Sequence, residues 1–175
     1  GVLGTAGVAR QVMVPAIQAS RNGTVLAMAS RSLSTATAFA KEFGIVRSYG
    51  SYDELLEDPD VQAVYIPLPN SMHRDWATTA AAGRQHVLCE KPLACNAREA
   101  EDMAAACRSH GVTLMEAFAN RFHPQSLLVK QLIDDGRIGN VMRVTSVHSS
   151  PRPPAGHTRL SRELCGGVLM DKGCY

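Results

Sequence analysis

A lysine, an aspartate and a tyrosine are the side chains of this sequence best suited to moving a proton. Lys91 follows the short apolar run His86–Cys89 and precedes Pro92, whose ring fixes the backbone as it leaves the predicted strand. Asp171 and Tyr175 lie at positions i and i+4, so they share one face of a helix. An ammonium group near a phenol favours the phenolate, so Lys91 could prepare Tyr175 to accept a proton. The alternative is structural, with an exposed lysine, a packing tyrosine and a solvated aspartate.

A glycine-rich turn opens the chain, and such a turn at the start of a helix can bind a pyrophosphate. Unpaired N–H groups and the positive end of the helix dipole lie there. Gly4 occupies the first position of the pattern GxGxxG, while Ala6 and Ala9 occupy the other two. No Asp or Glu precedes Glu42, so this segment favours a phosphate-rich ligand. An ordinary strand-to-helix turn is the alternative.

The end of the second predicted strand indicates which dinucleotide the fold would prefer. Arg31 lies there between Ser30 and Ser32, where a dinucleotide fold contacts the adenosine ribose. A carboxylate would accept hydrogen bonds from the 2′-hydroxyl of NAD, whereas an arginine between two hydroxyls suits the 2′-phosphate of NADP. Ser32 can also cap the next helix. The sequence predicts NADP, with NAD as the weaker candidate.

A loop with two prolines, Pro67–Asn70, leads from a predicted strand into a helix. Its fixed shape suits the wall of a cofactor site at the carboxyl end of a parallel sheet, although such a turn is equally often structural. His73, taken singly, is interpreted as a helix-surface residue and not as a catalyst. Glu90, beside Lys91, could pair with it in solvent, a contact of little energetic value.

The order of the elements predicts an α/β fold with a Rossmann-type parallel sheet and helices on both faces. Short apolar runs alternate with helical patterns over residues 1–118, which we interpret as a dinucleotide-binding domain. Pro15 should kink the first helix or shift its start. The predicted strands are Gly1–Leu3, Thr24–Ser30, Ala63–Pro67, His86–Cys89 and Thr113–Glu116. The predicted helices are Val8–Ser20, Leu33–Phe43, Tyr52–Glu57, Met72–Ala82 and Ala97–Ser109.

The pattern changes after residue 118. A helix over Gln125–Asp135, a strand over Val141–Val147 and a proline-rich loop predict the truncated start of an α+β, antiparallel-sheet domain over residues 119–175. The chain has no initiator methionine, so we interpret it as a fragment of a longer protein.

Composition argues against several classes of partner. The net charge of +2, the pI near 8.4 and the scattered Lys and Arg residues argue against nucleic acid and membrane surfaces. Five cysteines without a CxxC spacing or a neighbouring histidine pair argue against a disulfide framework and a zinc site, so no metal is expected. A reducing cytoplasm fits this cysteine usage.

Several motifs in one order resemble the Gfo/Idh/MocA oxidoreductases, within the branch of glucose–fructose oxidoreductase, NADP-dependent xylose dehydrogenase and dimeric dihydrodiol dehydrogenase. The resemblance spans the whole chain. The motifs are Gly1-x-x-Gly4-x-Ala6-x-x-Ala9, Tyr65–Asn70, Glu90-Lys91-Pro92, Met115–Phe118 with Arg121–Gln125, and Gly166-Gly167-x-x-x-Asp171-x-Gly173-x-Tyr175.

This resemblance implies an NADP-dependent oxidoreductase that moves a hydride between a sugar, polyol or related secondary alcohol and the nicotinamide. It implies that Lys91 and Tyr175 are catalytic, that Asp171 orients the substrate, and that the complete protein is a homo-oligomer. The alternative is a non-catalytic dinucleotide-binding module or an inactive fragment. The implied cofactor residues are Gly4, Thr5, Ala6, Val8, Ala9, Arg10, Ser30, Arg31, Ser32, Pro67, Leu68, Asn70, His73, Glu90, Lys91 and Arg121.

Overall fold

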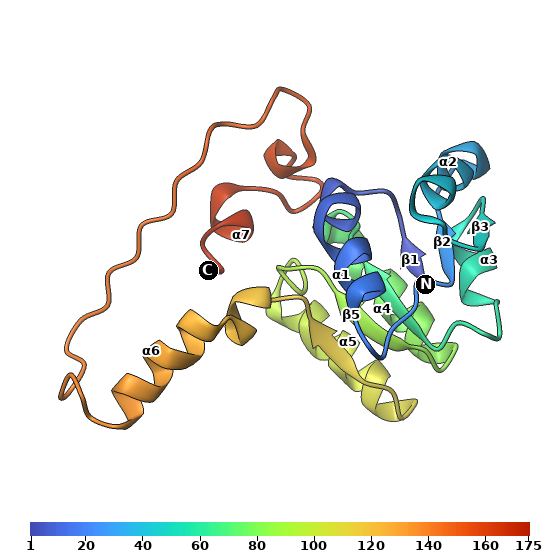
Figure 1. The fold of residues 1–175 in the computed structure, drawn as a ribbon. Coiled ribbons are helices and arrows are strands. Elements are labelled where there is room, and N and C mark those ends of the chain that lie inside the picture. Colours follow the sequence, from blue (N-terminus) through green and yellow to red (C-terminus); the bar gives the residue numbers. More distant parts are fainter.

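The computed structural model describes residues 1–175 and contains one six-stranded parallel sheet (Figure 1). Its strands lie in the order β3-β2-β1-β4-β5-β6, so the direction of winding reverses between β1 and β4. Doubly wound folds bind ligands at such a reversal, at the carboxyl ends of the strands. The predicted Rossmann-type sheet is therefore confirmed. The strands are β1 (Val2–Leu3), β2 (Ala27–Ala29), β3 (Arg47–Tyr49), β4 (Ala63–Ile66), β5 (His86–Cys89) and β6 (Leu114–Glu116).

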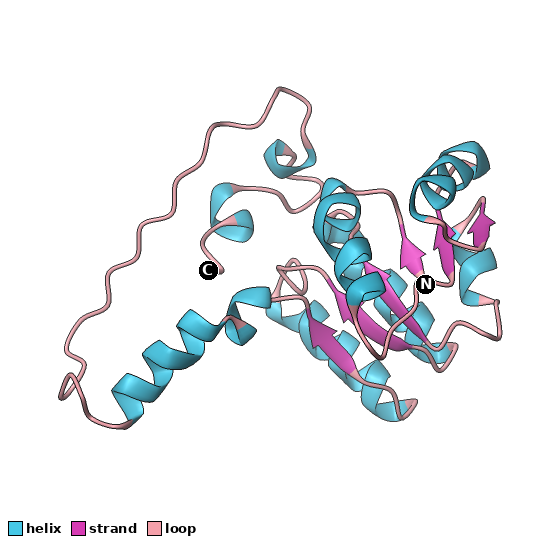
Figure 2. Cartoon of the chain, viewed as in Figure 1, coloured by secondary structure: helices cyan, strands magenta, loops and turns pink.

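Helices cover both faces of the sheet (Figure 2). Successive strand residues point to opposite faces, so Val2 and Met28 pack with α1 and α2, while Leu3 and Ala29 pack with α3, α4 and α5. Each face thus has its own apolar core. The helices of this region are η1 (Ala9–Met13), α1 (Val14–Ala19), α2 (Leu33–Phe43), α3 (Tyr52–Leu56), η2 (Asn70–Met72), α4 (His73–Ala82) and α5 (Ala97–Ser109).

Pro15 disturbs the first helix as predicted. The turns before it form the π-helix η1, in which the Val14 N–H donates to the Ala9 carbonyl five residues back. Proline has no N–H, so Pro15 cannot donate to the carbonyl of Gln11 and the regular α pattern fails there. The helix continues as α1 to Ala19.

Strand β3 was not predicted. Its residues Arg47, Ser48 and Tyr49 carry no apolar alternation, and side-chain contacts hold them in place. Arg47 donates to both carboxylate oxygens of Asp58 at 2.7 and 2.8 Å, and the Tyr49 hydroxyl donates to the same carboxylate at 2.9 Å. The buried carboxylate of Asp58, which lies further along the chain, thus helps to hold the strand.

Residues 119–175 contain helices but no strand. Helix α6 (Pro124–Asp134) lies within one residue of its predicted bounds, but the predicted strand over Val141–Val147 is wrong. A strand needs a partner for its backbone groups, and this segment has none. It belongs instead to an extended loop that arcs away from the sheet and returns to it at α7 (Figure 1). The remaining elements are η3 (Ala119–Phe122), η4 (Thr158–Leu160) and α7 (Val168–Asp171).

A disulfide joins Cys95 to Cys165, so the prediction that the cysteines form no disulfide is wrong. The two residues are 70 positions apart in sequence, and their Cα atoms lie 5.7 Å apart. The bond ties the loop after β5 to the segment that precedes α7. The prediction of a reducing compartment was based on these cysteines and stays a prediction.

Candidate active site

The backbone around Lys91 is held on several sides where it leaves β5. The Lys91 N–H donates to Glu90 Oε2 at 3.1 Å, and the Leu93 N–H donates to Glu116 Oε1 at 2.9 Å. The Lys91–Pro92 peptide bond is cis. The two hydrogen bonds hold the backbone from which the lysine side chain reaches Asp171 of α7.

The structure brings Lys91, Asp171 and Tyr175 together. Lys91 Nζ donates to the Asp171 carbonyl at 2.8 Å and to its Oδ1 at 3.1 Å, and the two side chains are only 12% and 15% exposed. The same ammonium lies 4.9 Å from the centre of the Tyr175 ring. A buried cation between a carboxylate and an aromatic face is held by both, so Lys91 has little freedom to leave.

Tyr175 does not share a helix face with Asp171, contrary to the prediction, because α7 ends at Asp171. The ring instead stacks on Phe118, with centroids 5.2 Å apart, and lies 5.5 Å from the ring of His148. Phe118 and His148 thus belong to the site although the sequence did not single out either for this role. Nothing in the local sequence pairs Phe118 with a residue so distant in the chain.

Two further contacts hold the segment before α7, one to the sheet edge and one to α7 itself. Asn70 Nδ2 donates to the carbonyl of Cys165 at 2.8 Å, and Arg159 Nε lies 3.2 Å from Asp171 Oδ1. Arg159 was not predicted, because only the fold brings it to the same carboxylate as Lys91. Asp171 therefore lies between two cations.

Glu90 does not pair with the lysine ammonium. Its carboxylate accepts a hydrogen bond of 2.8 Å from the Tyr65 hydroxyl and the bond from the Lys91 N–H. Burial, and then the charge of Glu90, raise the pKa of the Tyr65 phenol above its ordinary value. The Tyr65 phenol therefore stays protonated and donates a hydrogen bond to Glu90. This bond orients the Glu90 carboxylate beneath Lys91.

The glycine turn has the features that a pyrophosphate requires. The N–H groups of Thr5, Ala6 and Gly7 donate no hydrogen bond within the chain, so they are free to bind oxygen. Gly4 has a φ of 100°, and a Cβ there would lie 2.9 Å from Leu68 Cδ2, so only glycine fits. Ala9 is fully buried beneath the turn, where a small residue lets helix and strand pack closely. The residues fit a dinucleotide phosphate.

Arg31 lies exposed at the carboxyl end of β2, and its guanidinium makes no hydrogen bond or ion pair within the chain. Ser32 caps α2 by accepting from the Thr35 N–H, while Ser30 is buried. Arg31 is thus available to an anion beside the glycine turn.

Four residues of the predicted cofactor set do not present a polar group to the glycine turn or to Lys91. Arg10 pairs with Glu42 and lies over the ring of Phe39, so its guanidinium faces α2. Val8 and Arg121 are exposed, and their side chains make no polar contact. His73 is fully buried, which contradicts its interpretation as a helix-surface residue.

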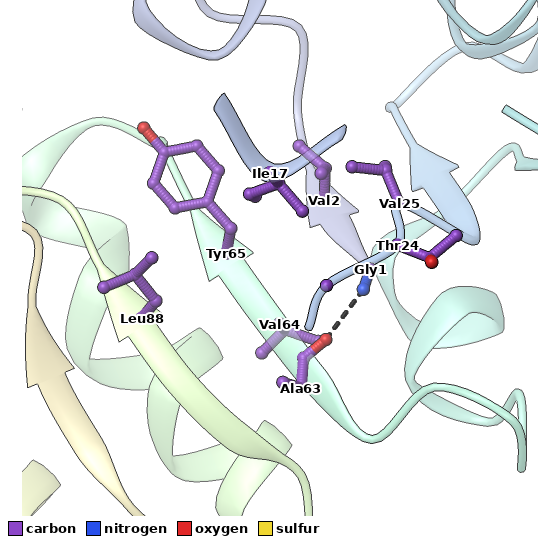
Figure 3. Close-up of a pocket in the computed structure, with 10 residues that line it drawn as sticks. Gly1, Val2, Ile17, Thr24, Val25, Ala63, Val64, Tyr65 and Leu88 are labelled. Carbon is purple, nitrogen blue, oxygen red and sulfur yellow. Dashed lines mark hydrogen bonds between the residues drawn. The ribbon is translucent and has the colours of Figure 1, made fainter. Parts of the chain in front are cut away.

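Two hollows flank these elements. One beside Tyr175 is lined by Ser146, His148, Val168, Lys172 and Gly173. The other, of about 160 Å³, lies between α1 and the strands β1 and β4, and its walls are mostly apolar (Figure 3). Its one phenol, on Tyr65, is already bonded to Glu90. The hollow beside Tyr175 is therefore the candidate substrate site.

No helix has both the length and the apolar composition that crossing a membrane requires. No three His, Cys, Asp or Glu side chains lie together in a group that could hold a metal ion.

Two family models match the chain. One, described as an oxidoreductase family with an NAD-binding Rossmann fold, matches residues 1–118. The chain belongs to the Gfo/Idh/MocA family. The model of the family's C-terminal domain matches residues 126–175.

Curated relatives of this Gfo/Idh/MocA chain include sugar dehydrogenases. The chain is 47% identical to D-xylose 1-dehydrogenase (NADP(+)) 2 of Haloferax volcanii, over all of this chain and 54% of the relative. It is 38% identical to trans-1,2-dihydrobenzene-1,2-diol dehydrogenase of Xenopus laevis, over 86% of this chain and 46% of the relative. The chain spans about half the length of the curated relatives it matches.

A solved structure superimposes on the whole chain. It is KijD10, a 3-ketoreductase from Actinomadura kijaniata in complex with NADP and TDP-benzene, with a TM-score of 0.94 and 38% identity over 100% of this chain and 54% of that one.

Proposed function

We propose that this chain supplies the cofactor site and the proton-transfer residues of an NADP-dependent oxidoreductase that acts on a hydroxyl of a sugar or polyol. The observation that carries the proposal is the cluster of Lys91, Asp171 and Tyr175 at the sheet edge that also presents the glycine turn. The relatives named for NADP-dependent xylose oxidation and sugar 3-keto reduction support it.

In this proposal the substrate hydroxyl lies in the hollow beside Tyr175. The Tyr175 oxygen takes the hydroxyl proton as the carbon loses its hydride, and the C–O bond becomes a carbonyl. NADP⁺, when bound, accepts that hydride. Reduction of a ketone runs through the same atoms in reverse.

The cation–carboxylate arrangement sets the electrostatics of the step. Lys91 is fixed near the Tyr175 ring, so its charge stabilises negative charge on the phenol and the substrate oxygen without any rearrangement. Asp171 holds the Lys91 ammonium in place and presents a carboxylate oxygen that can orient a second substrate hydroxyl. Glu90 fixes the backbone beneath the lysine.

The free amides of the glycine turn would hold the pyrophosphate, and Arg31 would hold the 2′-phosphate of NADP. The residues Pro67, Leu68 and Asn70 would form the wall between this turn and Lys91. The predicted homo-oligomer remains a prediction.

A turnover assay tests the proposal. The protein is incubated with NADP⁺ and a panel of aldoses and polyols, and the formation of NADPH is followed by its absorbance. We expect turnover that Tyr175→Phe nearly abolishes, because the ring remains but the hydroxyl is lost. Tyr49→Phe is the control, since it removes a phenol hydroxyl far from Lys91.

Two outcomes would count against the proposal. NADPH binding without turnover of any substrate would favour a non-catalytic dinucleotide-binding module. Retention of most of the turnover by Tyr175→Phe would exclude the tyrosine as the proton acceptor.

A further inference from the structure

His73 joins two loops of the site from within the protein. It is the first residue of α4, and its side chain is 0% exposed. Its Nε2 lies 2.9 Å from the Leu68 carbonyl oxygen, and its Nδ1 lies 3.0 Å from the Pro92 carbonyl oxygen. Carbonyl oxygens only accept, so whichever ring nitrogen carries a proton donates to the carbonyl that faces it.

The two loops carry different parts of the site. Leu68 belongs to the Pro67–Asn70 turn, and its side chain lies against Gly4. This turn therefore contacts the predicted phosphate-binding turn. Pro92 follows Lys91 directly. A backbone carbonyl faces each ring nitrogen, so neither nitrogen is open to a ligand, and the effect of His73 on the site must pass through these loops.

The backbone near Lys91 is held by two kinds of contact, one from the neighbouring strands and one from α4. Glu90 and Glu116 hold the N–H groups of Lys91 and Leu93, but both carboxylates come from the strands β5 and β6 or their ends. Within the first region, His73 is the side chain whose ring lies within hydrogen-bond distance of both the lysine loop and the opposite wall formed by the Pro67–Asn70 turn. The distance between Lys91 and the nucleotide turn therefore depends on this ring.

We propose that His73 is a positioning residue that sets the place of Lys91 relative to the nucleotide turn by bridging the carbonyls of Leu68 and Pro92. The inference rests on the proposed function. In this proposal His73 supports the two loops from inside the protein. The family resemblance had implied a direct contact with the cofactor instead.

The first test separates catalysis from binding. His73→Phe keeps a ring of similar size but removes both nitrogens, and His73→Asn keeps a donor for one of the two carbonyls. We expect kcat to fall about 10- to 100-fold in His73→Phe, because a misplacement of ~1 Å costs that much, and less in His73→Asn. The KM values for cofactor and sugar should stay within about 3-fold, since the nucleotide contacts remain.

Ala77→Gly is the matched control. Ala77 is fully buried in the same helix but contacts neither loop by a polar group, so its replacement weakens α4 without touching the bridge. A fall in kcat in Ala77→Gly as large as in the His73 variants, at equal loss of thermal stability, would overturn the proposal.

A double-mutant cycle gives the sharper readout. If His73 acts through Lys91, then His73→Asn in a Lys91→Met background should lower kcat by less than about 2-fold further. An equal effect in both backgrounds would show a general structural role and overturn the inference.

Hydrogen–deuterium exchange keeps the inference testable without turnover. The amides of Lys91 and Leu93 should exchange faster in His73→Asn than in the unmodified protein, and not in Ala77→Gly. Faster exchange together with no turnover of any sugar would support the bridge while the proposed function failed. Unchanged exchange in His73→Asn would overturn the bridge alone.

Discussion

Residues 1–118 and residues 119–175 are held in different ways. All 32 buried residues lie at or before Cys107, and most of them form the two cores that flank the sheet, with 16 residues in one and 10 in the other. In the second region the apolar side chains of α6, such as Leu127, Leu128 and Val129, are about half exposed. Apolar burial therefore stabilises the first region, but not the second.

The second region nevertheless supplies two of the three predicted catalytic residues. It docks through one disulfide, the hydrogen bond from Asn70, and the ion pair of Asp171 with Lys91. These are directed contacts that lie at the site itself. The geometry of the site can therefore be altered one contact at a time while the sheet stays folded.

Lys91→Met should have the largest effect, because it removes the charge that links the two regions. We expect kcat to fall by about 10²- to 10⁴-fold, the usual contribution of a proton-transfer group, with NADPH affinity within a few-fold. Steady-state kinetics and fluorescence titration measure the two quantities. The Cys95–Cys165 disulfide and the hydrogen bond from Asn70 to Cys165 remain, so the segment before α7 should stay docked.

Lys130→Met is the control for this variant, since Lys130 forms an exposed ion pair with Asp134 on α6. Loss of NADPH binding in Lys91→Met, with unchanged turnover per bound cofactor, would make Lys91 a cofactor clamp and would remove it from the proton step.

Breaking the disulfide should loosen the second region and leave the first intact. A loop of 70 residues gives a tethering contribution of up to about 4 kcal/mol in the chain-entropy model. In Cys95→Ser, we expect trypsin to cut after Arg159 about 10-fold faster or more, because ~1.4 kcal/mol of lost tethering already gives that factor. The digest is followed by mass spectrometry.

Cys174→Ser is the matched control, because Cys174 is a free thiol in the same region. Equal cleavage rates in the two variants would show that the polar contacts alone hold the segment before α7. Faster cleavage within the sheet region in Cys95→Ser would contradict the separation of the two regions.

The first region was largely predictable because its signals are local. Helices α2 and α5 have the predicted bounds, since Ser32 and Asn96 cap them by accepting from the N–H three residues later. The short apolar runs gave five of the six strands. Strand β3 was missed because its residues show no apolar alternation, and Asp58, whose carboxylate binds Arg47 and Tyr49, is marked by no periodicity.

The rest of the site depends on contacts between distant residues. No spacing rule joins Cys95 to Cys165, or places Arg159 beside Asp171. The two carbonyls that face His73 come from different loops, so the sequence cannot show that its ring is buried. The segment Val141–Val147 has the composition of a strand, but composition does not supply a partner.

Arg31→Ala should weaken the preference for NADPH over NADH. Arg31 lies in the first region, so the docking of the second region should not change. The protein should bind NADPH more tightly than NADH, and the variant should lose about 10-fold of that preference, because a hydrogen bond to a charged group contributes ~1.5 kcal/mol or more. Fluorescence titration of both dinucleotides measures it. Arg21→Ala is the control, since Arg21 is exposed and lies away from β2. Equal affinities in the unmodified protein would contradict the assignment.

Asp58→Asn should have the smallest effect, confined to the β3 edge of the first region. The Arg47 guanidinium, with smaller help from the Asp60 N–H and Tyr49, holds the pKa of the Asp58 carboxyl below its ordinary value. A carboxyl whose pKa is lowered on folding stabilises the fold above its unfolded pKa of about 3.9, and this contribution is lost as pH falls through the folded value.

Urea unfolding followed by circular dichroism tests this last expectation. At pH 7 the midpoint of Asp58→Asn should lie below that of the unmodified protein. The gap should narrow as the pH falls below about 4, where the unfolded carboxyl takes up a proton, and close below the lowered pKa of the native carboxyl. Asp60→Asn is the matched control, because Asp60 pairs with the same arginine but its side chain is 62% exposed, so its midpoint should change less. A gap that stays constant from pH 7 to the acid limit would show that Asp58 acts through its shape and not through its charge.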